Sequence, residues 1–153
     1  MPVRTAVYEE RLRVPWWWWP VAAALVATLG VAVGHPLGAA AGVVTSVLVF
    51  GLVAGLIAAY GTVRVAVESG MLVAGRARMP VSAVGRVDAL DAADTRDLLG
   101  PHADPAAYVL SRPYVPTAVR VEVTDPADPT PYWLVTTRRP DELASALRTA
   151  AGV

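Results

Sequence analysis

The sequence predicts a membrane α-helical hairpin of two transmembrane helices, joined to a small α+β domain. No Asp, Glu, Lys or Arg occurs in the fifty residues from Val14 to Val63, and several later segments alternate apolar and polar residues at a period of two. The whole chain is 55% hydrophobic and only 17% charged, which is too apolar for an ordinary soluble domain. We therefore divide it into an N-terminal segment (residues 1–15), a hairpin (16–63) and a C-terminal domain (64–153).

The uncharged run has the length of two membrane spans. A helix needs about 20 apolar residues to cross the hydrocarbon core, and Gly34-His35-Pro36-Leu37-Gly38 interrupts the run near its middle. Proline disfavours helix at the residue before it, and glycine permits a tight reversal. We expect spans at about Trp16–Val33 and Ala39–Val63, with a turn at 34–38. A cleaved signal peptide is the alternative, but its apolar region would be shorter and would not be followed by a second one.

Four consecutive tryptophans begin the first span. Successive helix positions are about 100° apart, so four in a row surround the helix and no single face can bury them all. Indole has an apolar body and one N–H, and it is enriched at the level of lipid headgroups. We interpret the four as a membrane-interface anchor, with a stacking platform for a ligand as the alternative. They are Trp16, Trp17, Trp18 and Trp19.

The arginines predict how the hairpin is oriented. They flank both of its ends, whereas the loop between the spans holds only His35. The positive-inside rule then places both termini in the cytoplasm and makes the chain a multi-pass protein of the plasma membrane. The flanking arginines are Arg4, Arg11, Arg13, Arg64, Arg76 and Arg78.

Glycines recur at four-residue spacing within the apolar run, and such pairs let helix backbones approach closely in lipid. Packing inside the hairpin is one interpretation, and a homodimer through Gly51 and Gly55 is the other. Neither span contains an ionisable residue, and the turn between them holds only His35. This gives no support for a transport pathway.

The C-terminal domain is expected to contain several antiparallel strands followed by one helix. Ser69-Gly70 should turn between the first two strands, Asp91–Leu99 should form a short helix or loop, and residues 101–116 should be irregular. The expected strands are Val63–Glu68, Met71–Ala77, Gly85–Leu90, Val115–Thr124 and Tyr132–Thr137.

The final helix begins at Pro140, with Thr137 or Asp141 as its cap, and ends near Gly152. A bent antiparallel sheet closed by such a helix resembles pleckstrin-homology-like (PH-like) architecture. The passage Tyr132-Trp-Leu-Val-Thr-Thr-Arg-Arg-Pro-Asp-Glu-Leu143 also looks like the end of bacterial PH-like domains found beside membrane hairpins.

Three passages together resemble a family of small actinobacterial membrane proteins of unknown function. They are Tyr8-Glu-Glu-Arg-Leu-Arg-Val-Pro-Trp-Trp-Trp-Trp19, Ser111-Arg-Pro-Tyr-Val115 and Asp128-Pro-Thr-Pro-Tyr-Trp-Leu-Val-Thr-Thr-Arg-Arg-Pro140. The resemblance implies an integral membrane protein, and it implies no activity.

The chain lacks the usual signs of catalysis. It has no cysteine, and its only histidines, His35 and His102, would lie on opposite sides of the membrane. Aspartates recur every three residues from Asp88 to Asp97, but no calcium-loop pattern with a closing Glu is present. We therefore expect no metal, no cofactor and no enzyme activity. Thirteen arginines balance thirteen acidic residues, so nucleic acid is not an expected partner.

Five residues are candidate contacts for a ligand or partner. Arg112, Arg138 and Arg139 could bind a phosphate or an anionic headgroup, although the last two could instead pair with nearby carboxylates. Tyr114, in the Pro-rich stretch, and Trp133, if it is exposed, would suit a protein partner. We expect a non-catalytic interaction module tethered to the bilayer, with an anionic-lipid-binding domain as the alternative.

Overall fold

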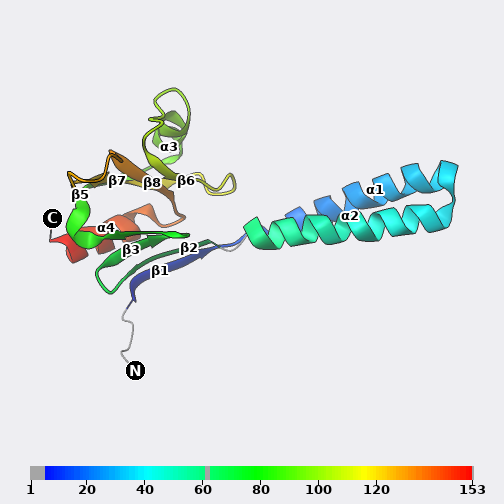
Figure 1. Ribbon diagram of the computed structural model, residues 1–153, viewed down its shortest axis with the longest axis horizontal. Coiled ribbons are helices and arrows are strands. Elements are labelled where there is room, and N and C mark those ends of the chain that lie inside the picture. Colours follow the sequence, from blue (N-terminus) through cyan, green and yellow to red (C-terminus); the bar gives the residue numbers. More distant parts are fainter. Residues whose placement is uncertain (1–5, 61–62, 153) are drawn as a thin grey trace. The chain divides into compact units, whose positions relative to one another are not determined.

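The computed structural model describes residues 6–60 and 63–152. The chain forms two compact units, a helical hairpin of residues 13–62 and a domain made from residues 1–12 and 63–153 (Figure 1). The domain is therefore discontinuous in sequence. Residues 1–15 were expected to form a separate segment, but strand β1 (Ala6–Leu12) pairs with β2 (Val63–Glu68) and belongs to the domain.

Helices α1 (Trp18–Leu37) and α2 (Ala39–Tyr60) form the hairpin. Both are long and apolar enough to cross a membrane, judged by length and composition. The expected turn at 34–38 is too wide, because α1 continues through Pro36 and only Gly38, at φ 93°, separates the helices. Pro36 is tolerated in the last turn of α1, where the Gly38 N–H still donates to the Gly34 carbonyl at 2.9 Å.

The two helices approach each other closely near this reversal. A Cβ atom placed on Gly42 would lie 2.5 Å from the Gly30 carbonyl oxygen and 2.9 Å from the Gly34 Cα. The predicted glycine packing within the hairpin is thus confirmed at this end. A Cβ atom on Gly51 or Gly55 would meet nothing within 4 Å, so neither packs against α1, and a homodimer through them stays a prediction.

The first sheet has the antiparallel order β1-β2-β3-β4. The predicted Ser69-Gly70 turn is confirmed, with positive φ at both residues (51° and 72°), as a type I′ hairpin turn requires. The single strand expected from Met71 to Ala77 is instead two, β3 (Met71–Ala74) and β4 (Ala77–Pro80), because the chain reverses at Gly75 with φ 66°.

The second sheet has the order β5-β7-β8-β6. A 3₁₀ turn (Val81–Ala83) leads into it. The strands β6 and β8 run parallel, so the expectation of a purely antiparallel fold is wrong for this pair, and β6 lies within the stretch expected to be irregular. The strands are β5 (Val84–Leu90), β6 (Tyr108–Leu110), β7 (Ala118–Val123) and β8 (Tyr132–Thr136).

Two helices complete the domain. Helix α3 (Ala92–Leu99) starts where the Asp91 carboxylate accepts the N–H groups of Ala93 and Asp94 at 2.8 and 2.9 Å. In α4 (Pro140–Ala151), Pro140 opens the helix and Gly152, at φ 74°, ends it as expected. The expected caps are wrong, because Arg139 holds the N-cap position and makes no side-chain capping bond.

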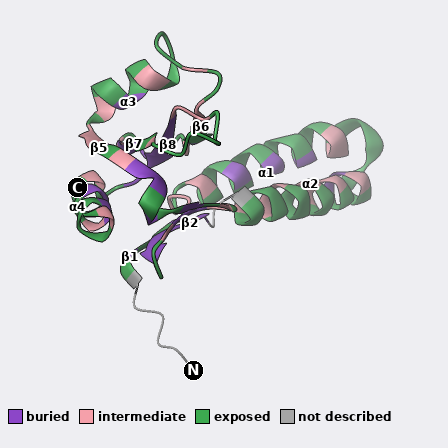
Figure 2. Cartoon of the chain, turned by 60° about the vertical axis from the view of Figure 1, so that its left-hand side comes forward, coloured by how far each residue is buried: buried purple, intermediate pink, exposed green. Residues whose placement is uncertain are grey.

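The core lies between the two sheets and α4. It collects the inward residues of both sheets together with Leu143, Ala144 and Leu147 of α4. Figure 2 shows these buried residues in the strands and α4, whereas the hairpin is mainly exposed. A smaller apolar cluster, built on Tyr132 and Leu134, fills the other face of β8, where Leu98 of α3 packs against it.

Candidate functional site

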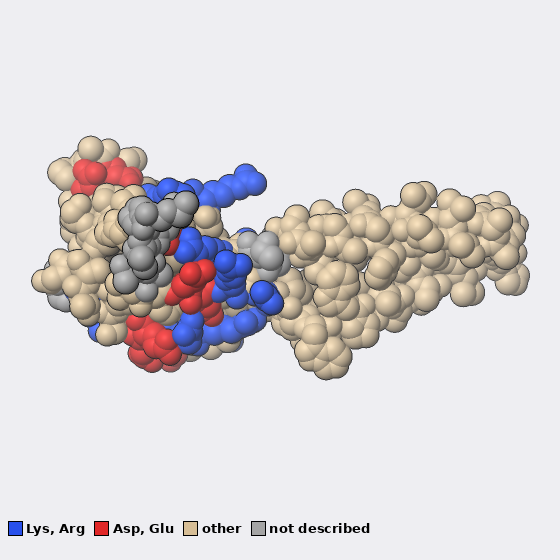
Figure 3. All heavy atoms as spheres, turned by 90° about the horizontal axis from the view of Figure 1, so that it is seen from below, with Lys and Arg blue, Asp and Glu red and all other residues tan. Residues whose placement is uncertain are grey.

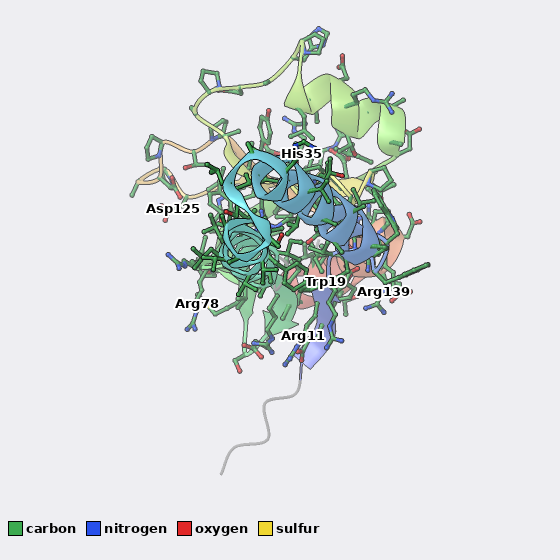
Figure 4. The ribbon with its side chains drawn as sticks, turned by 90° about the vertical axis from the view of Figure 1, so that its right-hand side faces the viewer. Arg11, Trp19, His35, Arg78, Asp125 and Arg139 are labelled. Carbon is green, nitrogen blue, oxygen red and sulfur yellow. The ribbon has the colours of Figure 1, made fainter. Side chains whose placement is uncertain are left out.

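The candidate residues Arg138 and Arg139 lie between β8 and α4, where the C-terminal part of the domain meets β1. The Arg139 guanidinium donates to the Glu142 carboxylate at 2.9 Å and to the Glu9 backbone carbonyl at 3.1 Å. Its Cζ also lies 5.1 Å from the centre of the Tyr8 ring. Arg139 therefore connects α4 to β1, and Figure 4 shows it at this side of the domain.

A buried carboxylate lies beside it. Glu10 is only 8% exposed, and its Oε2 accepts hydrogen bonds from the Tyr8 hydroxyl at 2.8 Å and from the Thr137 hydroxyl at 2.5 Å. Its Oε1 accepts the Arg138 backbone N–H at 3.3 Å. Burial raises the pKa of Tyr8 to about 12, so this phenol stays protonated as a donor. Because a buried carboxyl group needs hydrogen-bond partners, these contacts fix β1 onto the end of β8.

Arg112 and Tyr114 lie in the segment before β7. The Arg112 backbone N–H donates to the Thr136 hydroxyl at 3.2 Å, and its guanidinium donates to the Ser111 carbonyl at 3.0 Å. The Arg138 Cζ lies 5.9 Å from the centre of the Tyr114 ring. Arg138 thus lies against the ring of Tyr114 and Arg139 against that of Tyr8, so these consecutive arginines contact different parts of the domain.

A small cavity of about 210 Å³ adjoins Arg112, between α3 and the segment from Ser111 to Pro116. Arg96 and Thr95 also line it. The Thr95 hydroxyl is shielded from solvent and has no hydrogen-bond partner among the described residues.

Trp133 is not available to a partner, contrary to the prediction. It is 6% exposed and lies in the core, with its ring centre 4.4 Å from that of Tyr108. Tyr132 is buried as well, on the opposite face, with the Arg120 guanidinium 4.6 Å from its ring centre. Both faces of β8 are covered, because the main core with α4 packs on one face and the small cluster with Leu98 of α3 packs on the other.

The tryptophans at the start of the hairpin point in several directions. Trp16 is 79% exposed, Trp17 52% and Trp19 41%, whereas Trp18 is half-buried with its ring centre 5.9 Å from that of Trp17. Three large exposed indoles at one end of an apolar helix have the form expected of an interfacial anchor. Their placement in a bilayer stays a prediction.

Sequence reasoning used Arg64 only to orient the hairpin, but it is the centre of an ion-pair network on the outer face of the first sheet. Its guanidinium donates twice to the Glu68 carboxylate, at 2.9 and 2.7 Å, and twice to the Glu9 carboxylate, at 3.1 and 3.3 Å. Glu9 also accepts from Arg11 at 3.4 Å. The hydrogen bonds from Arg64 lower the pKa of Glu9, and those from Glu68 and Glu9 raise the pKa of Arg64.

Several of the aspartates and His102 make local structural contacts. Asp91 caps α3, Asp88 pairs with Arg86 at 2.9 Å, and Asp97 contacts the His102 ring at 2.9 Å on the surface. Within residues 6–60 and 63–152, no three His, Cys, Asp or Glu side chains lie close enough together to hold a metal ion.

Comparison with known proteins gives a family and no activity. No curated protein and no solved structure matches this chain. A family model described as "Protein of unknown function (DUF3093)" matches residues 7–147, from the first strand through most of α4. The chain therefore belongs to the DUF3093 family, whose function is unknown.

Proposed function

We propose that this chain is an integral membrane protein whose hairpin holds a non-catalytic α+β binding module at the cytoplasmic face of the plasma membrane. The observation that carries this proposal is the hairpin itself. The two helices contain candidate spans of 20 and 21 residues that have the length and composition to cross a membrane, and most of their apolar side chains are exposed. Water is a poor environment for so much contiguous apolar surface, and hydrocarbon is a good one.

The way the domain is assembled supports a two-span topology. Strand β1 precedes the hairpin and β2 follows it, yet they pair from Ala6 with Glu68 to Leu12 with Val63. A chain that crossed the bilayer once would put these strands on opposite sides. Their pairing therefore favours an even number of crossings, and the flanking arginines favour the cytoplasm.

A binding role suits the domain better than catalysis does. Two four-stranded sheets with a C-terminal helix support the proposed PH-like architecture, which displays loops and sheet ends to partners. Tethering confines the domain to the membrane plane, which raises the effective concentration of any membrane-bound partner. A protein partner would contact the Pro-rich segment around Tyr114, where Pro113 and Pro116 are exposed.

The alternative expected from the sequence, an anionic headgroup held by Arg112, Arg138 and Arg139, has less support. Two of these guanidinium groups already make short contacts, Arg112 with the Ser111 carbonyl and Arg139 with Glu142. Arg138 and Arg139 also face different aromatic rings. A single phosphate site built from all three would need these contacts to break.

Topology reporters fused at Gly38 and at the C-terminus test the membrane proposal. We expect extracytoplasmic activity at Gly38, cytoplasmic activity at the C-terminus, and retention of the full chain in membranes after an alkaline wash. Cytoplasmic activity at Gly38, or extraction by the wash, would refute the proposal.

Cross-linking in native membranes tests the protein-partner proposal. A photoreactive residue at Pro113 should capture one defined protein, whereas the same residue at the exposed Asp125, in the β7–β8 loop, is the matched control. Equal capture from both positions would contradict a specific contact at the Pro-rich segment.

A further inference from the structure

We propose that one end of the first sheet binds the phosphate groups of anionic lipids. This inference rests on the proposed membrane anchoring and assigns the lipid to a surface other than the one expected from the sequence. The surface is formed by four arginines of β1, β2, the β3–β4 turn and β4, and we call it the basic end. Its members are Arg11, Arg64, Arg76 and Arg78.

Strand register brings these four residues to the same end of the sheet. Arg11 lies directly opposite Arg64, one position before the last pair of the β1–β2 ladder, Leu12 with Val63. The β3–β4 turn lies at this end too, because Ala74 pairs with both Val65 and Ala77. Arg76 is in that turn and Arg78 follows it. Residues up to 67 positions apart in sequence thus share one sheet end through backbone pairing.

The four guanidinium groups differ in how far they are neutralised. Arg64 is held by Glu9 and Glu68, and Arg11, whose side chain is 66% exposed, shares Glu9 with it. Arg76 and Arg78 are exposed, and neither guanidinium group makes a hydrogen bond or ion pair with a described residue. The basic end thus contains four arginines and two carboxylates, and its unneutralised positive charge lies on Arg76 and Arg78.

The figures show the same arrangement. In Figure 3 the arginine side chains gather on one part of the domain surface with carboxylates among them. In Figure 4 Arg11 and Arg78 project outward from the domain rather than into its core. The guanidinium groups of Arg76 and Arg78, which contact no described carboxylate, are suited to phosphate oxygens, which arginine contacts in a bidentate manner.

The covalent chain keeps the basic end close to the hairpin whatever the orientation of the domain. Arg64 is four residues after Tyr60, where α2 ends, so the chain can separate them by no more than about 14 Å. Arg11 is five residues before Trp16, which limits that separation to about 18 Å. If the tryptophans lie at the headgroup level, the basic end lies near lipid phosphates, where the negative surface potential attracts arginine.

The charge pattern favours a membrane surface over nucleic acid. The chain carries thirteen basic and thirteen acidic residues, so it lacks the broad basic field that binds a nucleic-acid backbone. Helix α3 and the loop after it are acidic, with Asp91, Asp94, Asp97 and Asp104 against Arg96. An excess of positive charge at one sheet end, joined to an apolar hairpin by only a few residues of chain, fits a membrane surface, whose negative charge is limited to the thin headgroup layer.

Lipid titration of the full chain in a neutral detergent tests this inference. The association constants for short-chain phosphatidylglycerol and phosphatidylcholine are compared in the wild type and in the R76Q/R78Q variant. Each near-surface arginine contributes about 1 kcal/mol, or about fivefold, so the ratio of the two constants should fall about 30-fold in the double variant at low salt. The matched control is R86Q/R96Q, which removes the same charge from β5 and α3, where both arginines are exposed.

The outcomes separate this inference from the proposed function. An alkaline wash that leaves both variants in the membrane, together with a loss of phosphatidylglycerol preference only in R76Q/R78Q, supports the inference. Retention in the membrane with equal ratios in both variants overturns the inference while the anchoring stands. Extraction of the wild-type chain by the wash refutes the proposed membrane anchoring, on which this inference rests.

Discussion

Substituting Gly42 by alanine should loosen the hairpin far more than the same change at Gly51. Both glycines lie inside α2, and both changes gain up to about 1 kcal/mol of helix propensity. They differ in what the new methyl group meets. At Gly42 it would lie 2.5 Å from the Gly30 carbonyl oxygen and 2.9 Å from the Gly34 Cα, whereas at Gly51 it meets nothing within 4 Å.

The size of the effect follows from these distances. Carbon atoms in contact prefer a separation of about 3.5–4.0 Å, so the helices would have to part by roughly 1 Å near the reversal. Both neighbours of the new methyl group are backbone atoms, which cannot rotate away. Overpacking of this kind costs about 1–3 kcal/mol, and we expect Gly42→Ala to be less stable than Gly51→Ala by that amount. Gly30→Ala should be intermediate, because its methyl group meets mainly the Ser46 hydroxyl, a side chain that can turn.

The assay is unfolding of the full chain in mild detergent with increasing sodium dodecyl sulfate, followed by the fluorescence of the tryptophans at the start of the hairpin. Equal midpoints for Gly42→Ala and Gly51→Ala would refute the close helix contact. So would a lower midpoint for Gly51→Ala alone, which would instead indicate packing through the open face of α2.

Three further predictions concern the domain. Glu10→Ala removes the carboxylate that accepts from Tyr8, Thr137 and Arg138. The two hydroxyls can then bond only to each other and the Arg138 N–H loses its acceptor, so the free energy of unfolding should fall by about 1–3 kcal/mol; no change in a chemical unfolding curve would contradict this. Because the pKa of Tyr8 rises from 10.0 to about 12 on folding, the folded state keeps a proton that the unfolded state loses, and stability should decline as pH rises across that interval. Tyr8→Phe should flatten that decline, and an unchanged alkaline profile would argue against the assignment. Trp133→Ala truncates a core side chain and should lower the free energy of unfolding by about 3–5 kcal/mol, but it should leave the lipid preference of the folded protein unaltered. A loss of lipid binding without destabilisation would instead indicate that Trp133 contacts the lipid directly.

The parts of the fold that depend on local sequence were predictable. A fifty-residue uncharged run with one Gly-Pro interruption has few structural solutions, and the hairpin follows from it. The Ser69-Gly70 turn and the helix from Pro140 to Gly152 likewise depend on residues close together in the chain. These elements satisfy their backbone hydrogen bonds locally, so neighbouring residues are enough to predict them.

The parts that depend on distant pairing were not predictable from the same patterns. Every second residue of β1, namely Tyr8, Glu10 and Leu12, is buried. A glutamate at a buried position hides the strand pattern in the sequence, because its hydrogen-bond donor Thr137 lies far along the chain. Strand β6 is three residues long and pairs in parallel with β8 across some twenty intervening residues. A strand this short carries no periodicity of its own.

The candidate site was only partly predictable for a similar reason. Trp133 looked available because a Tyr-Trp pair alternates across a strand, and one of two faces is commonly solvated. An uninterrupted apolar run such as Tyr132 to Val135 is, however, typical of a strand covered on both faces, and that signal was present in the sequence. Nothing local marks Arg76 and Arg78 as neighbours of Arg11, because only the register of three strand pairs brings them together.

Because Leu12 pairs with Val63, the whole hairpin is inserted between two adjacent strand ends and could be removed. The same kind of pair, Glu68 with Met71, closes β2 and β3, where just two residues, Ser69 and Gly70, join the strands. Replacing residues 13–62 by an Asn-Gly dipeptide should therefore close β1 onto β2 in the same way. The product would be a water-soluble miniature of the protein that keeps every strand and the buried Glu10 cluster. Simple truncation before Val63 would instead discard β1 and leave β2 as a bare edge, open to aggregation.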